Sequence, residues 1–188
     1  PEELPVVAEA TPIAPAAVAP TDTPVPTATA AAVNLPAGAV AARLVNVVDG
    51  DTIDVTINGR QERVRYIGVD TPERGQPGYR AATEANAALL GAGSLYLVAD
   101  TSDRDRYDRL LRYVYTENGA MVNRGLIAQG WAQPVEYPPD IRFAGEFRQA
   151  ASEAAQAGRG FWSGTAVDGA MPYALTTGNA NIRKGPAK

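Results

Sequence analysis

The chain has 188 residues and a mass of 19.7 kDa, enough for one globular domain with flanking segments or for two small domains. Cysteine and histidine are both absent, which excludes disulfides, thiolate or imidazole metal ligands and catalytic triads that need histidine. The net charge of −4 gives no sign of a nucleic-acid-binding protein. Any catalysis must therefore use carboxylates, arginine, tyrosine, hydroxyls or a metal held by oxygen.

The first 40 residues contain 12 alanines, 8 prolines and 5 threonines, and no aromatic residue occurs before Tyr66. Such a segment cannot bury enough apolar surface to offset the entropy of ordering it. We therefore expect residues 1–38 to form a disordered, extended linker. A pair of strands built from the few valines and isoleucines is the alternative, but prolines interrupt every apolar run.

Five segments have the patterning of β-strands: residues 41–48, 52–57, 62–69, 94–99 and 110–116. Asn58-Gly59 separates the second and third segments and is the strongest short signal of a hairpin. In the third segment the alternation places Arg65 on one definite face of the strand, opposite Val64 and Tyr66.

Three helices are expected over residues 79–90, 121–129 and 140–158, the last with Asp140 as its N-cap. Five strands with a helix between the third and fourth is the order of an OB-fold barrel, although other α+β layouts share these counts. The predicted fold is α+β and mainly β: a five-stranded OB-fold barrel with three helices over residues 39–164, flanked by disordered segments.

Two short segments bring carboxylates to strand ends. Asp49 and Asp51 flank a glycine before the second strand, and residues 70–73 (Asp-Thr-Pro-Glu) follow the third. Oxygen ligands suit a hard cation such as Ca²⁺, and although each segment alone is ordinary turn chemistry, the two together indicate a site. A third segment, residues 101–111, is dense in charge and is either a solvated loop or a support that holds Arg109 towards a site.

Together these segments resemble the staphylococcal nuclease (thermonuclease) family over about residues 40–163. The resemblance rests on residues 49–52, on Arg65 five residues ahead of residues 70–73, and on residues 105–110. Later matches are residues 121–123, 129–130 and 161–163. The family's fold is an OB-type barrel with three helices. The resemblance implies a Ca²⁺-dependent endonuclease that hydrolyses DNA and/or RNA and leaves 3′-phosphate products.

The resemblance also implies catalytic roles for three residues. Arg65 and Arg109 match the family's two catalytic arginines, and Glu73 matches its catalytic glutamate. The chemistry is consistent without imidazole, because arginine forks match phosphate oxygens bidentately and stabilise the charge that builds up on phosphorus. A carboxylate such as Glu73 could orient the attacking water or accept its proton.

The metal and substrate residues follow from the same resemblance. Asp51 and Asp70 match the family's calcium-binding carboxylates, and Thr71 matches the position whose backbone carbonyl binds the ion. Asp49 matches an outer carboxylate near the ion. The remaining matches are the basic and aromatic pair near the terminal phosphate of the nucleotide, Arg106 and Tyr107.

Several features depart from the family's pattern. Asp108 stands where the family usually has glycine, and the loop of residues 74–79 is short where thermonuclease has a longer, lysine-rich loop. Residues 41–164 contain no lysine, 14 arginines and 16 acidic residues, whereas thermonuclease is strongly basic. Affinity for substrate from counterion release should therefore be weaker here.

The ends of the chain suggest its setting. Residues 181–186 (Asn-Ile-Arg-Lys-Gly-Pro) resemble the first strand of a bacterial SH3-like domain, so residues 165–188 are expected to be a linker followed by the start of such a domain, or else a charged tail. No apolar run is long enough to span a membrane, and the first residue is proline and not methionine. A linker rich in proline, threonine and alanine is common between a signal or anchor and the first folded domain of an exported protein. We therefore expect an extracellular or cell-surface protein whose signal or anchor lies upstream. We expect a monomer. The alternatives to a nuclease are a non-catalytic scaffold module of the same fold and an unrelated small barrel.

Overall fold

The computed structural model describes residues 35–164. The expected linker of residues 1–38 falls outside this range except for its last four residues. The expected SH3-like start within residues 165–188 also lies outside the described residues.

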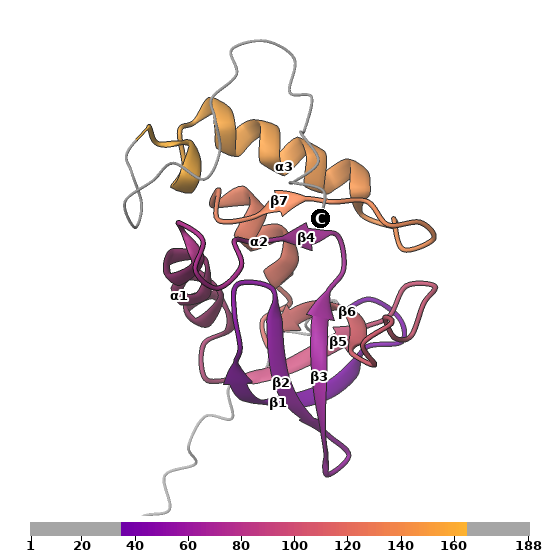
Figure 1. Ribbon diagram of the computed structural model, residues 1–188. Coiled ribbons are helices and arrows are strands. Elements are labelled where there is room, and N and C mark those ends of the chain that lie inside the picture. The colour runs from indigo at the N-terminus through magenta and orange to yellow at the C-terminus, as the bar shows by residue number, and fades with distance from the viewer. Residues whose placement is uncertain (1–34, 165–188) are drawn as a thin grey trace, which may run out of the picture. The chain divides into compact units, whose positions relative to one another are not determined.

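The five expected strands form a closed barrel in the order β1-β2-β3-β6-β5 (Figure 1). All neighbouring pairs are antiparallel except β3 and β6, which are parallel. The strands are β1 (Val40–Val47), β2 (Thr52–Ile57), β3 (Arg60–Tyr66), β5 (Ser94–Val98) and β6 (Leu110–Thr116). The five-stranded barrel predicted from the sequence is therefore confirmed.

Alternation along the strands builds the barrel core. Ile53 and Val55 of β2 are fully buried, while the residues between and after them are partly exposed. The β2–β3 hairpin turns at Asn58 and Gly59, whose φ angles of 49° and 80° confirm the expected turn. The core also contains other side chains that are at most 1% exposed, among them Val64, Leu95, Leu97 and Val114.

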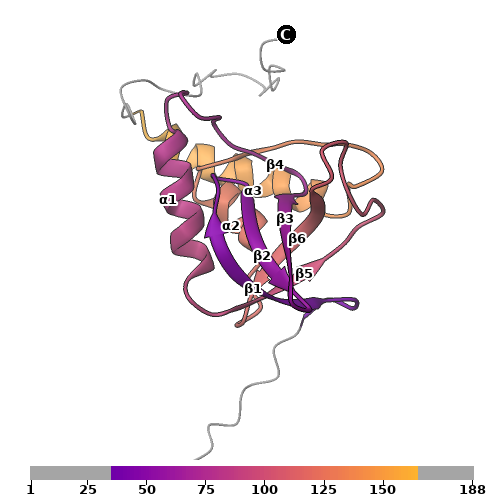
Figure 2. The ribbon, with the colours of Figure 1, turned by 60° about the horizontal axis from the view of Figure 1, so that its bottom comes forward.

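Three α-helices surround the barrel: α1 (Tyr79–Leu90), α2 (Val122–Ala128) and α3 (Ala144–Gln156). The bounds of α1 are the predicted ones, and α2 lies one residue inside its prediction at each end. Helix α1 runs along the side of the barrel (Figure 2), and α2 lies between the barrel and α3 (Figure 1). A 3₁₀ turn, η1 (Gly160–Trp162), follows α3 and buries Phe161.

The third strand ends earlier than its predicted limit at residue 69. It stops at Tyr66, because Gly68 has a φ of 74° and turns the chain out of the barrel. A side chain at this position would also lie within 2.7 Å of the Phe147 ring of α3. The next residues form a separate pair of short strands, β4 (Val69–Asp70) and β7 (Gln133–Pro134). Asp70 therefore lies outside the barrel sheet.

The last helix begins at Ala144, so the predicted N-cap role of Asp140 is wrong. The Asp140 carboxylate is used elsewhere: Oδ1 accepts hydrogen bonds from the backbone N–H groups of Thr101 (3.0 Å) and Ser102 (2.7 Å). These hydrogen bonds to a distant segment take the place of the helix cap that the local sequence predicted. The helix also ends earlier than predicted, at Gln156.

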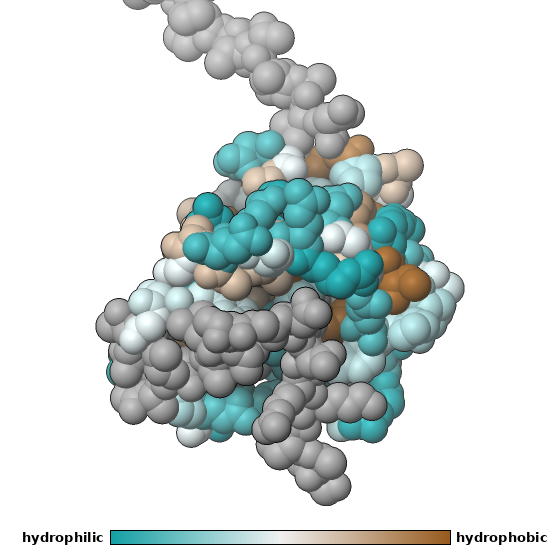
Figure 3. Space-filling model, turned by 90° about the horizontal axis from the view of Figure 1, so that it is seen from above, coloured by the Kyte–Doolittle hydropathy of each residue, from teal (hydrophilic) through white to brown (hydrophobic). Residues whose placement is uncertain are grey.

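The described surface is mainly hydrophilic where it is visible from above α3 (Figure 3), with separate apolar spots and no continuous apolar face. Helix α3 buries Phe147, Ala150 and Ala154 and exposes charged and amide side chains on its other side. Among residues 35–164, no helix is long and apolar enough to cross a membrane.

Candidate active site

The two carboxylate segments predicted from the sequence meet at one end of the barrel. Asp51 is 6% exposed, and its Oδ2 accepts hydrogen bonds from the backbone N–H and the hydroxyl of Thr71, each 2.9 Å long. Gly50 allows this approach, because a Cβ atom there would lie 2.6 Å from Thr71 Oγ1. The glycine between Asp49 and Asp51 therefore lets the β1–β2 turn pack directly against the segment that carries Asp70 and Thr71.

Arg65 of β3 joins this pair of segments. Its Nε lies 3.1 Å from Asp51 Oδ1, and its Nη2 lies 3.5 Å from Asp70 Oδ1. Its Nη1 donates to the backbone carbonyls of Val69 (2.7 Å) and Tyr66 (2.9 Å). With a side chain only 16% exposed, the Arg65 guanidinium is held in one orientation by both carboxylates and by the turn after β3.

The charges of this cluster do not balance. Burial raises the pKa of Asp51 to about 6, against the opposing effect of Arg65, and the nearby Asp49 and Asp70 raise it further. Burial also raises the pKa of Asp70, again opposed by Arg65. One arginine therefore compensates three neighbouring carboxylates only in part, so a cation would be favoured here.

Helix α1 supports the turn that holds Asp49 and Asp51. Asn86 is fully buried, accepts a hydrogen bond from the Tyr66 hydroxyl (2.9 Å) and donates to the backbone carbonyl of Asp49 (2.9 Å). The Tyr79 hydroxyl donates to the Val48 carbonyl over 3.2 Å. These bonds fix the carboxylate turn against a rigid element, and the apolar pattern that predicted α1 gave no sign of them.

The second arginine lies on the loop before β6. Asp105 organises this loop: its Oδ1 accepts from the backbone N–H groups of Tyr107 (2.9 Å) and Arg109 (3.0 Å), and its Oδ2 lies 2.7 Å from Arg109 Nε and 2.6 Å from Nη2. The Tyr107 ring is 64% exposed, and its centroid lies 4.7 Å from the guanidinium carbon of Arg106 and 5.4 Å from that of Arg109.

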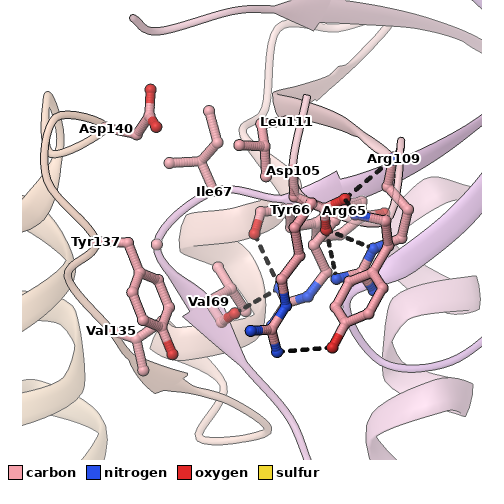
Figure 4. A pocket seen from close by; sticks show the side chains of 13 residues that line it. Arg65, Tyr66, Ile67, Val69, Asp105, Arg109, Leu111, Val135, Tyr137 and Asp140 are labelled. Atoms are coloured by element: carbon pink, nitrogen blue, oxygen red, sulfur yellow. Dashed lines mark hydrogen bonds and ion pairs between the residues drawn. The ribbon is translucent and has the colours of Figure 1, made fainter. Parts of the chain in front are cut away.

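Arg65 and Arg109 line the same pocket, which has a volume of about 450 Å³. In Figure 4 both arginines lie on one side of this pocket, and Val135 and Tyr137 lie on the opposite side. Arg106 and Tyr107 also line it, so two of the three implied catalytic positions, Arg65 and Arg109, lie beside both implied substrate positions, whereas Glu73 is not part of the lining. Sequence reasoning missed the places of Tyr137 and Asp140 in the pocket, because only the return of distant segments brings these side chains there. It also missed the support that Asp105 gives to Arg109, although the two residues are only four positions apart.

Glu73 and Asp49 make fewer contacts with the other residues of the site than Asp51 and Arg65 do. The Glu73 side chain is exposed in the loop after Thr71, and its backbone N–H binds Gln76 Oε1 (2.8 Å). Within residues 35–164, no direct contact links Glu73 to the two arginines or to Asp51. Asp49 Oδ1 accepts from the backbone N–H of Asp51 (3.1 Å), so it shapes the turn rather than entering the pocket.

The residues that could hold a metal are Asp51, Asp70 and the carbonyl of Thr71. In the described part of the chain no three acidic side chains form a ready cation cage. The donor set nevertheless fits a hard cation, because all its atoms are oxygens. Asp70 is 54% exposed and therefore open to a cation. Each Asp51 oxygen already has two partners: Oδ2 accepts from the Thr71 N–H and hydroxyl, and Oδ1 accepts from the Thr52 hydroxyl and lies beside Arg65 Nε. A cation bound by Asp51 would therefore replace one of these contacts.

The sequence is similar to those of known nucleases. A family model described as "Staphylococcal nuclease homologue" matches residues 63–164. Endonuclease YncB of Bacillus subtilis (strain 168) is 38% identical over 134 residues, which cover 64% of this chain and 63% of that protein. The SPbeta prophage-derived endonuclease YokF of the same organism is 37% identical over 132 residues, which cover 66% of this chain and 44% of that protein.

The thermonuclease of Staphylococcus hyicus is 32% identical over 127 residues, which cover 64% of this chain and 75% of that protein. The chain thus spans less than two thirds of the length of the two Bacillus relatives. The match to the family model begins within β3 and runs to the end of the described residues, beyond η1.

Proposed function

Because the chain belongs to the family of staphylococcal nuclease homologues, we propose that it is a Ca²⁺-dependent endonuclease that hydrolyses phosphodiester bonds of DNA and/or RNA and leaves 3′-phosphate products. The observation that carries this proposal is the placement of Arg65 and Arg109 on one pocket, with Asp51 and Asp70 in direct contact with Arg65.

The two arginines bind and orient the phosphate. Arg109 contacts Asp105 through Nε and Nη2, which leaves its Nη1 group for a phosphate oxygen. Arg65 is pointed by the Val69 carbonyl and Asp51 towards the same pocket. Because both guanidinium groups are fixed before substrate binds, little reorganisation is needed when charge develops on the phosphate.

The carboxylates of the site would hold Ca²⁺. Asp51, Asp70 and the Thr71 carbonyl are the proposed ligands, with Asp49 shaping the turn behind them. A bound Ca²⁺ ion would supply further positive charge at the phosphate. Calorimetric titration with Ca²⁺ tests the ligands: Asp51→Asn should weaken binding at least tenfold, and equal affinity in both proteins would place the metal elsewhere.

The other side chains of the site are proposed to position the attacking water and to bind the nucleic acid. Glu73 is exposed to solvent and is proposed to orient the attacking water or accept its proton. Arg106 and the exposed ring of Tyr107 are proposed to contact the terminal phosphate of the bound strand. Tyr137, on the opposite wall of the pocket, gives an aromatic surface against which a base could stack.

The decisive experiment is cleavage of plasmid DNA and of RNA with Ca²⁺ and with EDTA. We expect Ca²⁺-dependent cleavage that falls at least about 100-fold in Glu73→Gln without loss of stability, because this exposed side chain makes no core contact. The matched control is Glu84→Gln. This substitution changes an exposed glutamate on α1, away from the loop of Glu73, and should keep full activity. Full turnover in folded Glu73→Gln would refute the assigned role.

We also propose that the protein acts as a monomer outside the cell or at the cell surface. The proline-, alanine- and threonine-rich residues 1–38 support this setting, since such segments commonly separate an anchor or signal from a folded domain. The molar mass from light scattering tests the oligomeric state and should equal that of one chain, 19.7 kDa. Assays of culture medium, cell envelope and lysate of the source cells test the location, and activity confined to the lysate would contradict it.

A further inference from the structure

Arg104 joins the barrel to the loop that carries Tyr107 and Arg109. Its Nη1 lies 3.0 Å from Glu62 Oε2 on β3 and donates to the backbone carbonyl of Asp108 over 2.8 Å. The same Nη1 lies 3.6 Å from Asp108 Oδ1. One guanidinium group, 33% exposed, therefore holds a barrel strand and the far side of the loop together.

The loop needs such support at Asp108. This residue has a φ of 64°, a left-handed conformation that is unfavourable for side chains other than glycine and tolerated best by asparagine and aspartate. The backbone N–H of Asp108 bonds to the Asp105 carbonyl (3.1 Å), so the loop closes tightly around Asp105. Arg104 binds both the carbonyl and the carboxylate of Asp108, which favours the strained conformation.

The barrel end of this link is equally well placed. Glu62 lies on β3 three residues before Arg65, and β3 pairs with the start of β6 through Val64 and Leu110. Arg104 itself forms an isolated bridge with Leu110. The contact between Arg104 and Glu62 therefore fixes the loop relative to the same strand that carries Arg65.

We propose that Arg104 is a positioning residue that keeps Asp108 in its left-handed conformation and so holds Arg109 and Tyr107 at the pocket shared with Arg65. This inference rests on the proposed nuclease function. Arg104 lines a second groove with Glu62 and Asp108, and is absent from the lining of the pocket that holds Arg65; Tyr107 and Arg109 line both. It therefore acts through the loop and not on the substrate.

The test measures kcat and KM of Arg104→Ala at saturating Ca²⁺, below its melting transition. We expect kcat to fall by about 10- to 100-fold, because a displacement of about 1 Å in a catalytic group has effects of this size. Ca²⁺ affinity should stay unchanged, since Arg104 does not contact Asp51 or Asp70. The matched control is Arg63→Ala, which removes an arginine of the same groove whose partner, Asp54, lies on β2.

A second substitution separates positioning from general destabilisation. Glycine adopts a φ near 64° without support, so Asp108→Gly should restore kcat in the Arg104→Ala background to within about threefold of Asp108→Gly alone. The Nε–Hε NMR signal of Arg109 provides a readout without substrate: it should shift or broaden in Arg104→Ala and return in the double variant. If Arg104→Ala does not fold, Glu62→Gln removes the barrel end of the link instead.

Unchanged kcat in Arg104→Ala, or a loss that Asp108→Gly does not restore, would overturn the positioning role. Failure of the nuclease proposal itself looks different. In that case the wild type would not cleave nucleic acid, or Arg109→Ala would cleave as well as the wild type.

Discussion

At the residue scale, the ion pair of Asp51 and Arg65 sets the chemistry of the site. Asp51 is nearly buried, and its two oxygens meet Arg65 on one side and Thr71 on the other. Burying a charged carboxylate costs free energy unless an opposite charge compensates it fully. Arg65 does not compensate Asp51 fully, because it is also bonded to the Val69 carbonyl and to Asp70. Arg65 therefore compensates the charge of these carboxylates only in part.

This imbalance predicts the titration of Asp51 in EDTA. Its folded pKa of about 6 lies above the ordinary value of 3.8, so the folded state binds this proton more tightly than the unfolded state. The stability contributed by Asp51 is fully present below about pH 4 and is lost as the pH rises through about 6. Carboxyl ¹³C NMR in EDTA should show a midpoint near pH 6, and saturating Ca²⁺ should move it lower. A midpoint at or below pH 4 in EDTA would contradict the prediction.

The sequence predicted these residues unevenly. The carboxylates of Asp51 and Asp70 lie in short motifs that indicated a cation site, whereas the role of Arg65 was implied by the family resemblance. The structure brings the three side chains into contact. The role of Asp140 was missed, because its carboxylate binds backbone about 40 residues earlier in the chain. No local pattern encodes a partner at that distance.

At the element scale, helix α1 shows how an ordinary amphipathic pattern can hide a functional support. Alanines and leucines at helical spacing predicted α1 with its observed bounds. The fully buried position that matters for the site is Asn86, a polar residue on the buried side of that helix. Its amide satisfies the Tyr66 hydroxyl and the Asp49 carbonyl, so the helix is tied to the carboxylate turn.

Substitution Asn86→Ala is expected to destabilise the protein by about 2–4 kcal/mol, because it leaves the buried Tyr66 hydroxyl and the partly buried Asp49 carbonyl without their partner. Urea unfolding measures this change. The matched control is Tyr79→Phe, which removes the longer bond to Val48 and should cost less than about 1 kcal/mol. Equal losses in the two variants would show that Asn86 is not the main tie between α1 and the turn.

At the scale of the whole molecule, most positive charges of the folded part are paired with nearby negative charges, and neither sign is in large excess. Many arginines of the folded part are held by nearby carboxylates, as in the pairs Arg63–Asp54 and Arg112–Asp103. The overall charge therefore gave no sign of a nucleic-acid site, whereas the pocket gathers Arg65, Arg106 and Arg109 in one place. Composition could not predict this local concentration, because it depends on which arginines the fold brings together.

The boundary of the folded domain gives the last prediction. Leu35 is partly buried against the core, and the Ala39 N–H bonds to the Pro36 carbonyl over 3.3 Å. A chain that starts at residue 39, the boundary predicted from the sequence, lacks Leu35. We therefore expect it to be less stable than a chain that starts at residue 35. Loss of one partly buried leucine costs about 1 kcal/mol, or roughly 3–5 °C in melting temperature for a domain of this size.

Thermal melts at equal Ca²⁺ compare the full chain with both truncated chains. We expect the chain starting at residue 35 to melt within about 2 °C of the full chain, because residues 1–34 contain no aromatic residue and no run of alanine, valine, isoleucine or leucine longer than four residues. The chain starting at residue 39 should melt lower, and Leu35→Ser in the longer truncated chain should reproduce that loss. Equal melting of the two truncated chains would mean that the Leu35 contact contributes nothing to stability. A large drop on removal of residues 1–34 alone would instead show that this segment stabilises the domain, and the linker expectation would be wrong.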